Sequence, residues 1–353
     1  MANKEKAEVQ DINRSMYDFR YEEKDTDFYK IQEGLTKDIV LEISEKKGDP
    51  DWMRDFRLKS LEIYNQKQVP QWGPSIDGLD MNNIVTYVKP KTKMTADWEE
   101  VPEDIKNTFE KLGIPQAERE SLAGVGAQYD SELVYHNLQK EVEEQGVVYT
   151  DIESALHGPY ADMIRDHFMH LVPPTDHKFA ALHGAVWSGG SFVYIPKGVS
   201  VEIPLQSYFR LNAPGAGQFE HTLIIVDEGA QLHFIEGCSA PKYNIANLHA
   251  GCVELYVGKN AKLRYSTIEN WSKNMYNLNT KRAIVEEGGT MEWVSGSFGS
   301  HVSYLYPMTI LKGDNSRMEF TGVTFAGKGQ NLDTGAKVVH NGKNTSSYIN
   351  TRS

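Results

Sequence analysis

The stretch VDEGAQL, from Val226 to Leu232, joins two apolar runs through a tight turn. The Asp, Glu and Gly at its centre favour a turn, while the β-branched residues that precede it favour a strand. The same pattern of strand, turn and strand returns further along the chain as VGKNAKL (257–263), VEEGGTM (285–291), LKGDNSRM (311–318) and HNGKNTS (340–346). A related turn lies earlier, at Pro196 to Val201.

The turns recur at a nearly constant interval. Positions Ala230, Ala261, Gly289, Asn315 and Asn344 are separated by 31, 28, 26 and 29 residues. A repeat of about 30 residues made of short strands is typical of a solenoid, in which each coil pairs with the edges of the next. The alternative is a β-sandwich, whose turns recur about every 8 to 12 residues. The spacing therefore favours a β-solenoid.

The net charge and the pattern of residue types differ between two regions of the chain. Of the net charge of −12, residues 1–150 carry −11 and residues 151–353 carry −1. We expect an acidic, mainly helical N-terminal region at 1–150 and a β-solenoid core at 151–353. The acidic N-terminal region would repel the negatively charged phosphate backbone of a nucleic acid. The sequence also contains no nucleic-acid-binding motif, so we expect no nucleic-acid partner.

Two segments of the N-terminal region show helical periodicity. Apolar residues at helical spacing precede Gly48, which predicts a helix that ends at that glycine. A similar spacing predicts a second helix from Ser131 to Gln145.

The sequence predicts a cytoplasmic protein with no membrane partner. Its first residues lack the apolar segment of a secretory signal, and no run reaches the roughly 18 apolar residues of a membrane span. In a reducing compartment, the two cysteines, Cys238 and Cys252, should be free thiols and not a disulfide.

Motifs of several enzyme classes are missing. The segment from Gly342 to Thr345 lacks the spacing of a phosphate-binding P-loop, and neither a dinucleotide-binding glycine motif nor a serine nucleophile elbow is present. The sequence therefore encodes neither ATP hydrolysis nor serine hydrolysis.

Four histidines lie close together in the sequence, as the ligands of a metal site often do. His167, His170, His177 and His183 lie within 17 residues, but Pro173-Pro174 interrupts the group and no cysteine or zinc-protease motif accompanies it. We therefore interpret these side chains as exposed or core imidazoles.

The two cysteines have different surroundings. Cys252 lies within an alternating strand among apolar neighbours, which is typical of an inert core thiol. Cys238 lies between Gly237 and Pro241, which should end the strand and expose the thiol in a turn.

A functional thiol needs a nearby cation. A free cysteine has a pKa of about 8.5, so only a minority is thiolate at neutral pH unless a positive charge lowers that pKa. Arg210 and Lys281 are candidate cations, about one coil or more away, if their side chains point to the same side.

Six ordered motifs resemble those of a known family. They are YFRLNA (208–213), GQFE (217–220), IEGCSAP (235–241), LHA (248–250), YSTIENW (265–271) and TKRA (280–283). Together with the run from Glu33 to Arg57, and with GKNT at 342–345, they are similar to the SufB branch of the SufB/SufD family, the scaffold subunits of the SUF iron-sulfur cluster assembly system. The resemblance extends from about Asp18 to the end of the sequence.

The resemblance implies a particular fold and a C-terminal part of the family that this sequence does not include. It implies a mainly β protein with a right-handed parallel β-helix core behind an α-helical N-terminal region. The family's C-terminal helical part, with its second important cysteine and the proposed cluster ligands, would lie beyond residue 353. We therefore expect a C-terminally truncated chain, whose metal ligands cannot be assigned from the residues present.

The resemblance also implies site residues. Cys238 matches the family's persulfide-accepting cysteine. Eight further positions match residues around an internal sulfur route: Arg210, Asn212, Glu220, His249, Thr267, Glu269, Trp271 and Lys281. Cationic and hydrogen-bonding groups in such an interior would stabilise a persulfide anion. Glu269 departs from related members, which can carry Gln there, and a carboxylate would oppose an anion.

The implied function is a scaffold and not an enzyme. It would work with the SufC ATPase, which hydrolyses ATP, with SufD, with a sulfur donor of SufE or SufU type and with cluster acceptor proteins. Its cofactor would be a transient iron-sulfur cluster of 4Fe-4S type, with reduced flavin as a further candidate. The sequence leaves the cluster type and the use of flavin open. Whether it pairs with SufD or with itself stays open.

Two other functions were considered. The first is a structural β-helix subunit of SufD type, without sulfur-acceptor chemistry. The second is a β-helix enzyme acting on carbohydrate, which needs paired acidic residues in a groove. The adjacent pairs Asp227 with Glu228, and Glu286 with Glu287, fall in turns and are most simply solvated.

Overall fold

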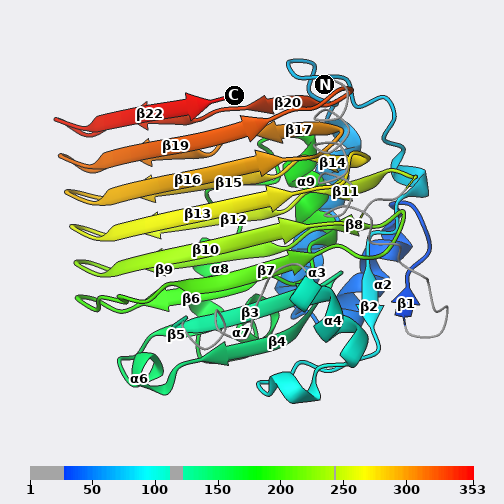
Figure 1. Cartoon of the computed structure of the whole chain (residues 1–353), viewed down its shortest axis with the longest axis horizontal. Coiled ribbons are helices and arrows are strands. Elements are labelled where there is room, and N and C mark those ends of the chain that lie inside the picture. The colour runs from blue at the N-terminus through cyan, green and yellow to red at the C-terminus, as the bar shows by residue number, and fades with distance from the viewer. Residues whose placement is uncertain (1–27, 112–121, 242–243) are drawn as a thin grey trace, which may run out of the picture.

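The computed structural model describes residues 28–111, 122–241 and 244–353. These residues form three parallel stacks of strands with helices packed beside them (Figure 1). The mainly β, solenoid architecture predicted from the turn repeat is confirmed.

The helices of the described residues are short and concentrate before residue 190. They are α2 (Lys37–Lys47), α3 (Asp51–Gln66), η1 (Met81–Asn83), η2 (Trp98–Glu100), α4 (Glu103–Lys111), α6 (Lys140–Glu143), α7 (Ile152–Ala155), α8 (Ala161–His167) and α9 (Lys178–Val186). Helix α2 ends at Gly48, whose φ of 63° allows the left-handed C-cap, as predicted.

Three sheets form the solenoid, and two strands lie outside it. The eight-stranded sheet contains, in spatial order, β22 (Ser346–Arg352), β19 (Arg317–Phe325), β16 (Thr290–Phe298), β13 (Lys262–Asn270), β10 (Gln231–Ser239), β7 (Leu205–Arg210), β3 (Gly124–Tyr129) and β4 (Glu132–Leu138). The five-stranded sheet contains β20 (Asn331–Thr334), β17 (Val302–Leu305), β14 (Met275–Asn277), β11 (Asn247–His249) and β8 (Gly217–Gln218). The seven-stranded sheet contains β21 (Lys337–His340), β18 (Met308–Leu311), β15 (Thr280–Val285), β12 (Cys252–Val257), β9 (His221–Val226), β6 (Ser191–Ile195) and β5 (Val148–Asp151). Strands β1 (Phe28–Lys30) and β2 (Val88–Pro90) pair with each other.

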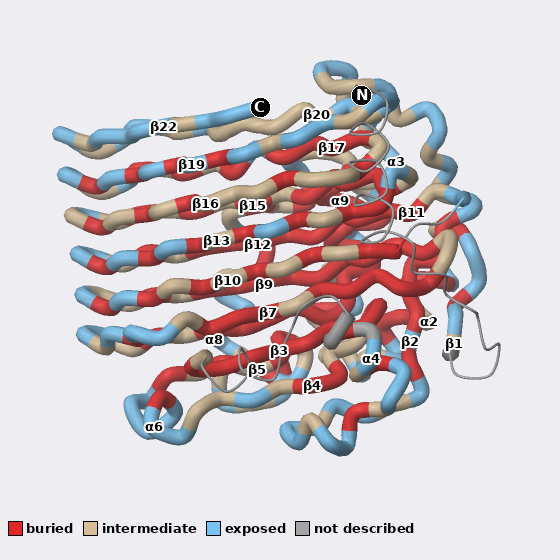
Figure 2. The backbone as a smooth tube through the Cα atoms, in the orientation of Figure 1, coloured by how far each residue is buried: buried red, intermediate tan, exposed pale blue. Residues whose placement is uncertain are grey.

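Each coil visits the three sheets in turn and stacks on the previous coil in register. For example, β10, β11 and β12 form one coil, and β13, β14 and β15 form the next. Equivalent side chains therefore form rows, such as Phe234, Tyr265, Trp293 and Phe320. These rows of side chains fill the interior of the solenoid. Figure 2 shows that the strands are largely buried, whereas the turns that join them are exposed.

The repeated turns form a column of left-handed residues. Gly229, Asn260, Gly288, Asn315 and Asn344 have φ values of 69°, 55°, 67°, 60° and 54°. The backbone N–H groups of the first four each donate to a carbonyl in the turn of the following coil, at 2.8 to 2.9 Å. Gly and Asn tolerate this conformation, which explains why they mark the repeat in the sequence.

The beginning of the solenoid differs from prediction at one segment. The helix predicted from Ser131 to Gln145 is wrong, because Glu132–Leu138 forms strand β4 and only the short helix α6 follows it. Strand β4 pairs with the edge of β3, and its Val134 and Tyr135 pack with Phe109 and Tyr129. Tertiary pairing at the sheet edge thus overrides a weak helical periodicity.

Helices and the segments between them cover the outer face of the seven-stranded sheet. Leu223 of β9 packs outward into one cluster with Ile164 of α8, Phe168 and Trp187. Because alternate residues of a strand face the same side of a sheet, the residues at even spacing from Leu223, and their register partners on neighbouring strands, point away from the solenoid interior and toward these helices.

We predict that the turn column is sensitive to side-chain shape. Asn315 is exposed and has a φ of 60°, so Asn315→Val should lower the free energy of unfolding by about 1–2 kcal/mol, because a β-branched residue resists the left-handed conformation. Asn315→Gly is the matched control and should change it by less than about 0.5 kcal/mol. Urea unfolding measures both, and equal losses for the two variants would contradict this explanation.

Candidate functional site

The interior of the solenoid changes from apolar to polar along each strand. The inward-facing residues of β10 are Leu232 and Phe234, followed by Glu236 and Cys238. On β13 the same sequence of positions carries Leu263 and Tyr265, followed by Thr267 and Glu269. The in-register stacking therefore gathers the polar residues of neighbouring coils into one buried zone.

Cys238 lies in this zone and not on the surface. Strand β10 continues to Ser239, and Cys238 is 3% exposed, so the predicted exposure of the thiol in a turn is wrong. Gly237 has another role: a Cβ there would lie 2.9 Å from Cδ1 of Tyr208 on the neighbouring strand. The glycine makes room for a tyrosine ring on the outer face and does not end the strand.

Two other side chains that can bind a metal ion lie next to the Cys238 thiol. One ligand atom each of Glu220, Cys238 and His249 lie within 4.8 Å of one another, and all three residues are buried. Glu220 precedes β9 and His249 ends β11, so two sheet corners bring them to the thiol. Gly251 permits this approach, because a Cβ there would lie 2.4 Å from Oε1 of Glu220.

Lys281 connects the carboxylates of this zone. Its Nζ donates to Oε1 of Glu236 at 2.7 Å and to Oγ1 of Thr267 at 3.1 Å, and it lies 3.4 Å from Oε1 of Glu269. The hydroxyl of Tyr265 donates to the other oxygen of Glu236. Lys281 itself is 2% exposed, so these contacts replace its hydration.

A hydrogen-bonded chain links Lys281 to the cysteine cluster. Nδ2 of Asn277 donates to Oε2 of Glu269 at 2.7 Å, and Oδ1 of Asn277 lies 2.7 Å from Nδ1 of His249. The other nitrogen of His249 contacts Oε1 of Glu220 at 2.5 Å, and Trp271 packs on the His249 ring with centroids 4.6 Å apart. Polar contacts thus run without a break from Glu236 to Glu220.

The electrostatics of this zone keep the resting thiol protonated. Burial raises the pKa of Cys238 well above its ordinary value, and the carboxylates of Glu236, Glu220 and Glu269 act in the same direction. Lys281 lowers that pKa but is outweighed. Burial alone would lower the pKa values of Lys281 and His249, but the neighbouring carboxylates more than offset it, so both pKa values are raised and the cationic forms are favoured.

The structure brings six of the eight predicted route residues into this zone with Cys238 and places the other two at a neighbouring position. Arg210 pairs in register with Ser239, one residue beyond Cys238 and therefore on the opposite strand face, and its Nη1 lies 3.2 Å from Oγ of Ser239. The backbone N–H of Asn212 donates to Oδ1 of Asp130 at 2.6 Å.

Three members of the network were missed in the sequence. Glu236 contacts the predicted Lys281, and Asn277 contacts the predicted Glu269. Tyr265 donates to Glu236, and its ring centroid lies 5.5 Å from Nζ of Lys281. Glu236 and Tyr265 could have been found, because each lies two residues from a predicted site residue and so faces the same side of its strand. Asn277 had no comparable signal, since its role depends on the corner before β15.

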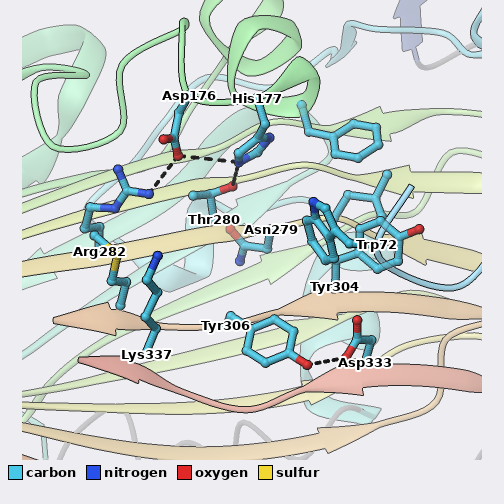
Figure 3. A pocket seen from close by; sticks show the side chains of 13 residues that line it. Trp72, Asp176, His177, Asn279, Thr280, Arg282, Tyr304, Tyr306, Asp333 and Lys337 are labelled. Atoms are coloured by element: carbon cyan, nitrogen blue, oxygen red, sulfur yellow. Dashed lines mark hydrogen bonds and ion pairs between the residues drawn. The ribbon is translucent and has the colours of Figure 1, made fainter. Parts of the chain in front are cut away.

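A second group of ligand types and a surface pocket lie outside the interior. Ligand atoms of His183, His221 and Cys252 lie within 4.8 Å of one another, and all three residues are buried. A pocket of about 440 Å³ lies nearby on the outer side of the solenoid, and Figure 3 shows Asp176, His177, Thr280 and Arg282 along its wall.

Among the described residues, no helix has the length and apolar character that a membrane crossing requires.

Comparisons with known proteins agree with the fold and the motifs. Residues 209–353 match the family profile described as SUF system FeS cluster assembly, SufBD core domain, and residues 42–207 match the SufBD protein N-terminal region. The iron-sulfur cluster assembly protein SufB of Bacillus subtilis is 52% identical over 337 residues, which cover 96% of this chain and 72% of that protein. SufBD family proteins of Staphylococcus epidermidis and Staphylococcus aureus are each 50% identical over the same coverage.

We predict that Lys281 is essential to the stability of the interior. Lys281→Met leaves the buried carboxylates of Glu236 and Glu269 without their cation and should lower the free energy of unfolding by about 3–5 kcal/mol. Lys262→Met is the control: Lys262 forms a surface ion pair with Glu292 at 2.6 Å, and its loss should cost less than about 1 kcal/mol. Chemical denaturation followed by tryptophan fluorescence compares them; similar losses would refute the assignment.

We also predict a pH dependence that originates at Asp130. Burial raises the pKa of Asp130 to about 6, whereas an aspartate in the unfolded chain has a pKa of about 3.9. Between these values the folded chain binds a proton that the unfolded chain does not, so this group's contribution to stability falls as pH rises from about 4 to about 6.

Asp130→Asn isolates this contribution, because the amide oxygen can still accept from the N–H groups of Asn212 and Ala213. The stability of the wild type relative to the variant should fall by about 2–3 kcal/mol between pH 4 and pH 7. A difference that stays constant, or grows with pH, would show that Asp130 is not the titrating group.

Proposed function

Because the chain belongs to the SufBD family of iron-sulfur cluster assembly proteins, we propose that it accepts persulfide sulfur on Cys238 and passes it through the solenoid interior to a nascent cluster. One observation carries the proposal: Cys238 shares a buried polar zone with Glu220, His249 and Lys281. Cys252 lies instead on the outer face of the seven-stranded sheet, where it packs with Val172 and Ala180.

The accepting step is a transfer of sulfane sulfur between two cysteines. The Cys238 thiol gives up its proton, and its sulfur attacks the terminal sulfur of the donor persulfide. A new sulfur–sulfur bond forms on Cys238, the donor's sulfur–sulfur bond breaks, and the donor leaves as a thiolate that takes up a proton. No net oxidation occurs, so the step needs no further reductant or oxidant.

Glu220 is the base that this step requires. Only the thiolate attacks, yet burial and three carboxylates hold the resting thiol in its protonated form. Oε1 of Glu220 contacts His249, whereas Oε2 is buried with no hydrogen-bond partner among the described residues, so it can accept the thiol proton. Burial lowers the pKa of His249, but the carboxylates of Glu220 and Glu269 raise it overall, which favours a positive charge beside Cys238.

The interior offers donors to an anionic sulfur species beyond Cys238. Lys281 supplies a positive charge, and the indole Nε1 of Trp271 is buried without a hydrogen-bond partner among the described residues. Glu269 opposes an anion less than its charge suggests, because its carboxylate is engaged by Lys281 and Asn277. These contacts support a route that starts at Cys238 and follows the network.

Access to the thiol requires local opening near the end of β10. Cys238 is only one residue from the end of that strand, and Asn244 and Ile245 shortly beyond it are exposed. A donor that binds this edge needs to displace few residues. Burial in the absence of a donor protects the thiol from oxidation.

The partners in this proposal are those of the SUF machinery. They are the SufC ATPase, SufD, a sulfur donor of SufE or SufU type and cluster acceptor proteins, and the cargo is a transient 4Fe-4S cluster. ATP hydrolysis is assigned to SufC because the sequence of this chain lacks a P-loop. The setting is the cytoplasm.

Transfer of isotopically labelled sulfur from a cysteine desulfurase and its SufE- or SufU-type donor tests the proposal. Mass spectrometry should find the label on the peptide that contains Cys238, and the Cys252 peptide of the same chain is the internal control. Cys238→Ser should reduce labelling to background. Glu220→Gln should slow it by about 100-fold, the typical contribution of a general base.

Two results would contradict the proposal. If Cys238→Ser keeps the label, or if the label resides on Cys252, then Cys238 is not the acceptor. If the folded wild type takes no label from a donor that labels an established acceptor, the chain is a structural subunit of SufD type.

A further inference from the structure

His183, His221 and Cys252 meet on the outer face of the seven-stranded sheet. His221 begins β9 and Cys252 begins β12, and the two are direct partners in the parallel register, so their side chains lie side by side. Helix α9 crosses this face and contributes His183, whose Nε2 lies 3.0 Å from Nδ1 of His221. The residues are 0–1% exposed.

The outer nitrogens of both imidazoles lie near oxygen atoms. Nδ1 of His183 lies 2.9 Å from the carbonyl oxygen of Ala250, in hydrogen-bonding geometry, whereas Nε2 of His221 lies 3.2 Å from Oε2 of Glu254 without forming a hydrogen bond. Histidines that bind a metal usually donate their second ring N–H to a backbone carbonyl or a carboxylate, which fixes the tautomer and orients the ring. Ala250 occupies this position for His183, and Glu254 lies close to it for His221, so the nitrogens that face each other are the ones placed to coordinate.

Glu254 is itself fixed in position by the backbone. It accepts hydrogen bonds from the N–H groups of Met169, Leu171 and Val172 at 2.5 to 2.9 Å. The ring of His221 is further held by Phe168, with ring centroids 4.2 Å apart.

We propose that His183 Nε2, His221 Nδ1 and Cys252 Sγ form a binding site for a divalent transition-metal ion of the Zn²⁺ type. Two imidazoles and one thiolate are ligands that Zn²⁺ and its close analogue Co²⁺ prefer. Three protein ligands leave the fourth tetrahedral position for a water molecule or another donor. This site is separate from the interior network and does not depend on sulfur transfer.

The geometry needs only small adjustments to hold the ion. With Zn–N distances of about 2.0–2.1 Å and a Zn–S distance of about 2.3 Å, tetrahedral ligands lie about 3.4–3.6 Å apart. The two nitrogens, now 3.0 Å apart, must separate by a few tenths of an ångström, and the sulfur lies within 4.8 Å of a nitrogen of each ring and must move closer.

Binding of the ion displaces protons from its ligands. When the ion binds, Cys252 loses its thiol proton, and the proton in the hydrogen bond between Nε2 of His183 and Nδ1 of His221 leaves that bond.

The pocket in Figure 3 provides an approach from solvent. Thr280, which lines the pocket, is the register partner of Cys252 on the neighbouring strand. Adjacent strands are about 4.8 Å apart, so the pocket reaches within one strand of the Cys252 thiol. Thr280 Oγ1 lies 3.1 Å from Nε2 of His177, which lines the same pocket.

Co²⁺ is the probe for the test, because a thiolate ligand adds a sulfur-to-metal charge-transfer band to its spectrum. The full chain is expressed in cobalt-supplemented medium, so that the ion is present while the buried site folds, and is then desalted. About one Co²⁺ per chain and a charge-transfer band are expected. Cys252→Ser should remove the band and His183→Gln should lower bound cobalt by at least about tenfold, whereas Cys238→Ser should keep both.

X-ray absorption of the cobalt-loaded wild type provides a readout that does not depend on the folding of variants. It should show one sulfur and two imidazole nitrogens around the ion. Folded wild type without cobalt, or an ion with only oxygen and nitrogen ligands, would overturn the proposal. A charge-transfer band lost in Cys238→Ser but kept in Cys252→Ser would also overturn it, because the ion would then lie in the solenoid interior.

Discussion

The buried contact between Lys281 and the carboxylates of Glu236 and Glu269 is the constraint on which the rest of the interior depends. A charge inside a solenoid loses its hydration, and only close counter-charges and hydrogen bonds can replace it. Because Lys281 and Glu236 lie on different sheets and in successive coils of the solenoid, their contact also ties one coil to the next. The relative position of these two coils is therefore coupled to the polar zone that surrounds Cys238.

The two thiols of the chain lie on different sides of this wall and have different surroundings. Cys238 faces inward among carboxylates and cations, whereas Cys252 faces outward beneath helix α9, in contact with Val172 and Ala180. Burial raises the pKa of both thiols, and nearby carboxylates add to the effect. Both are therefore held in a protected, protonated state, and each requires a specific event to become a thiolate: removal of a proton by a base at Cys238, and arrival of a metal ion at Cys252.

The fold could be predicted from the sequence because its signal is local and repeated. Gly and Asn occupy the left-handed turn positions in coil after coil, and in-register stacking then follows from the pairing of equivalent strands. The segment of β4 could not be predicted in this way, because its conformation is decided by the edge of β3, which it meets only in the folded chain.

The site could be predicted in part for the same reason. Alternation within strands places Cys238 beside Glu269, and the family motifs identify both. The exposure of Cys238 was predicted wrongly, since Gly237 serves the packing of Tyr208 and does not end the strand. The group of His183, His221 and Cys252 had no sequence signal, because α9 brings together residues that are far apart in the chain.

The central claim is that the interior holds Cys238 as a neutral, inaccessible thiol until a donor opens the site. The pH dependence of its alkylation by a small uncharged reagent, followed by mass spectrometry of the Cys238 peptide, tests this claim most directly. The account predicts that Cys238 reacts far more slowly than an exposed cysteine and is half ionised only at a pH above the ordinary pKa of a cysteine, about 8.5. Rapid alkylation at neutral pH, with half ionisation near or below pH 7, would contradict it.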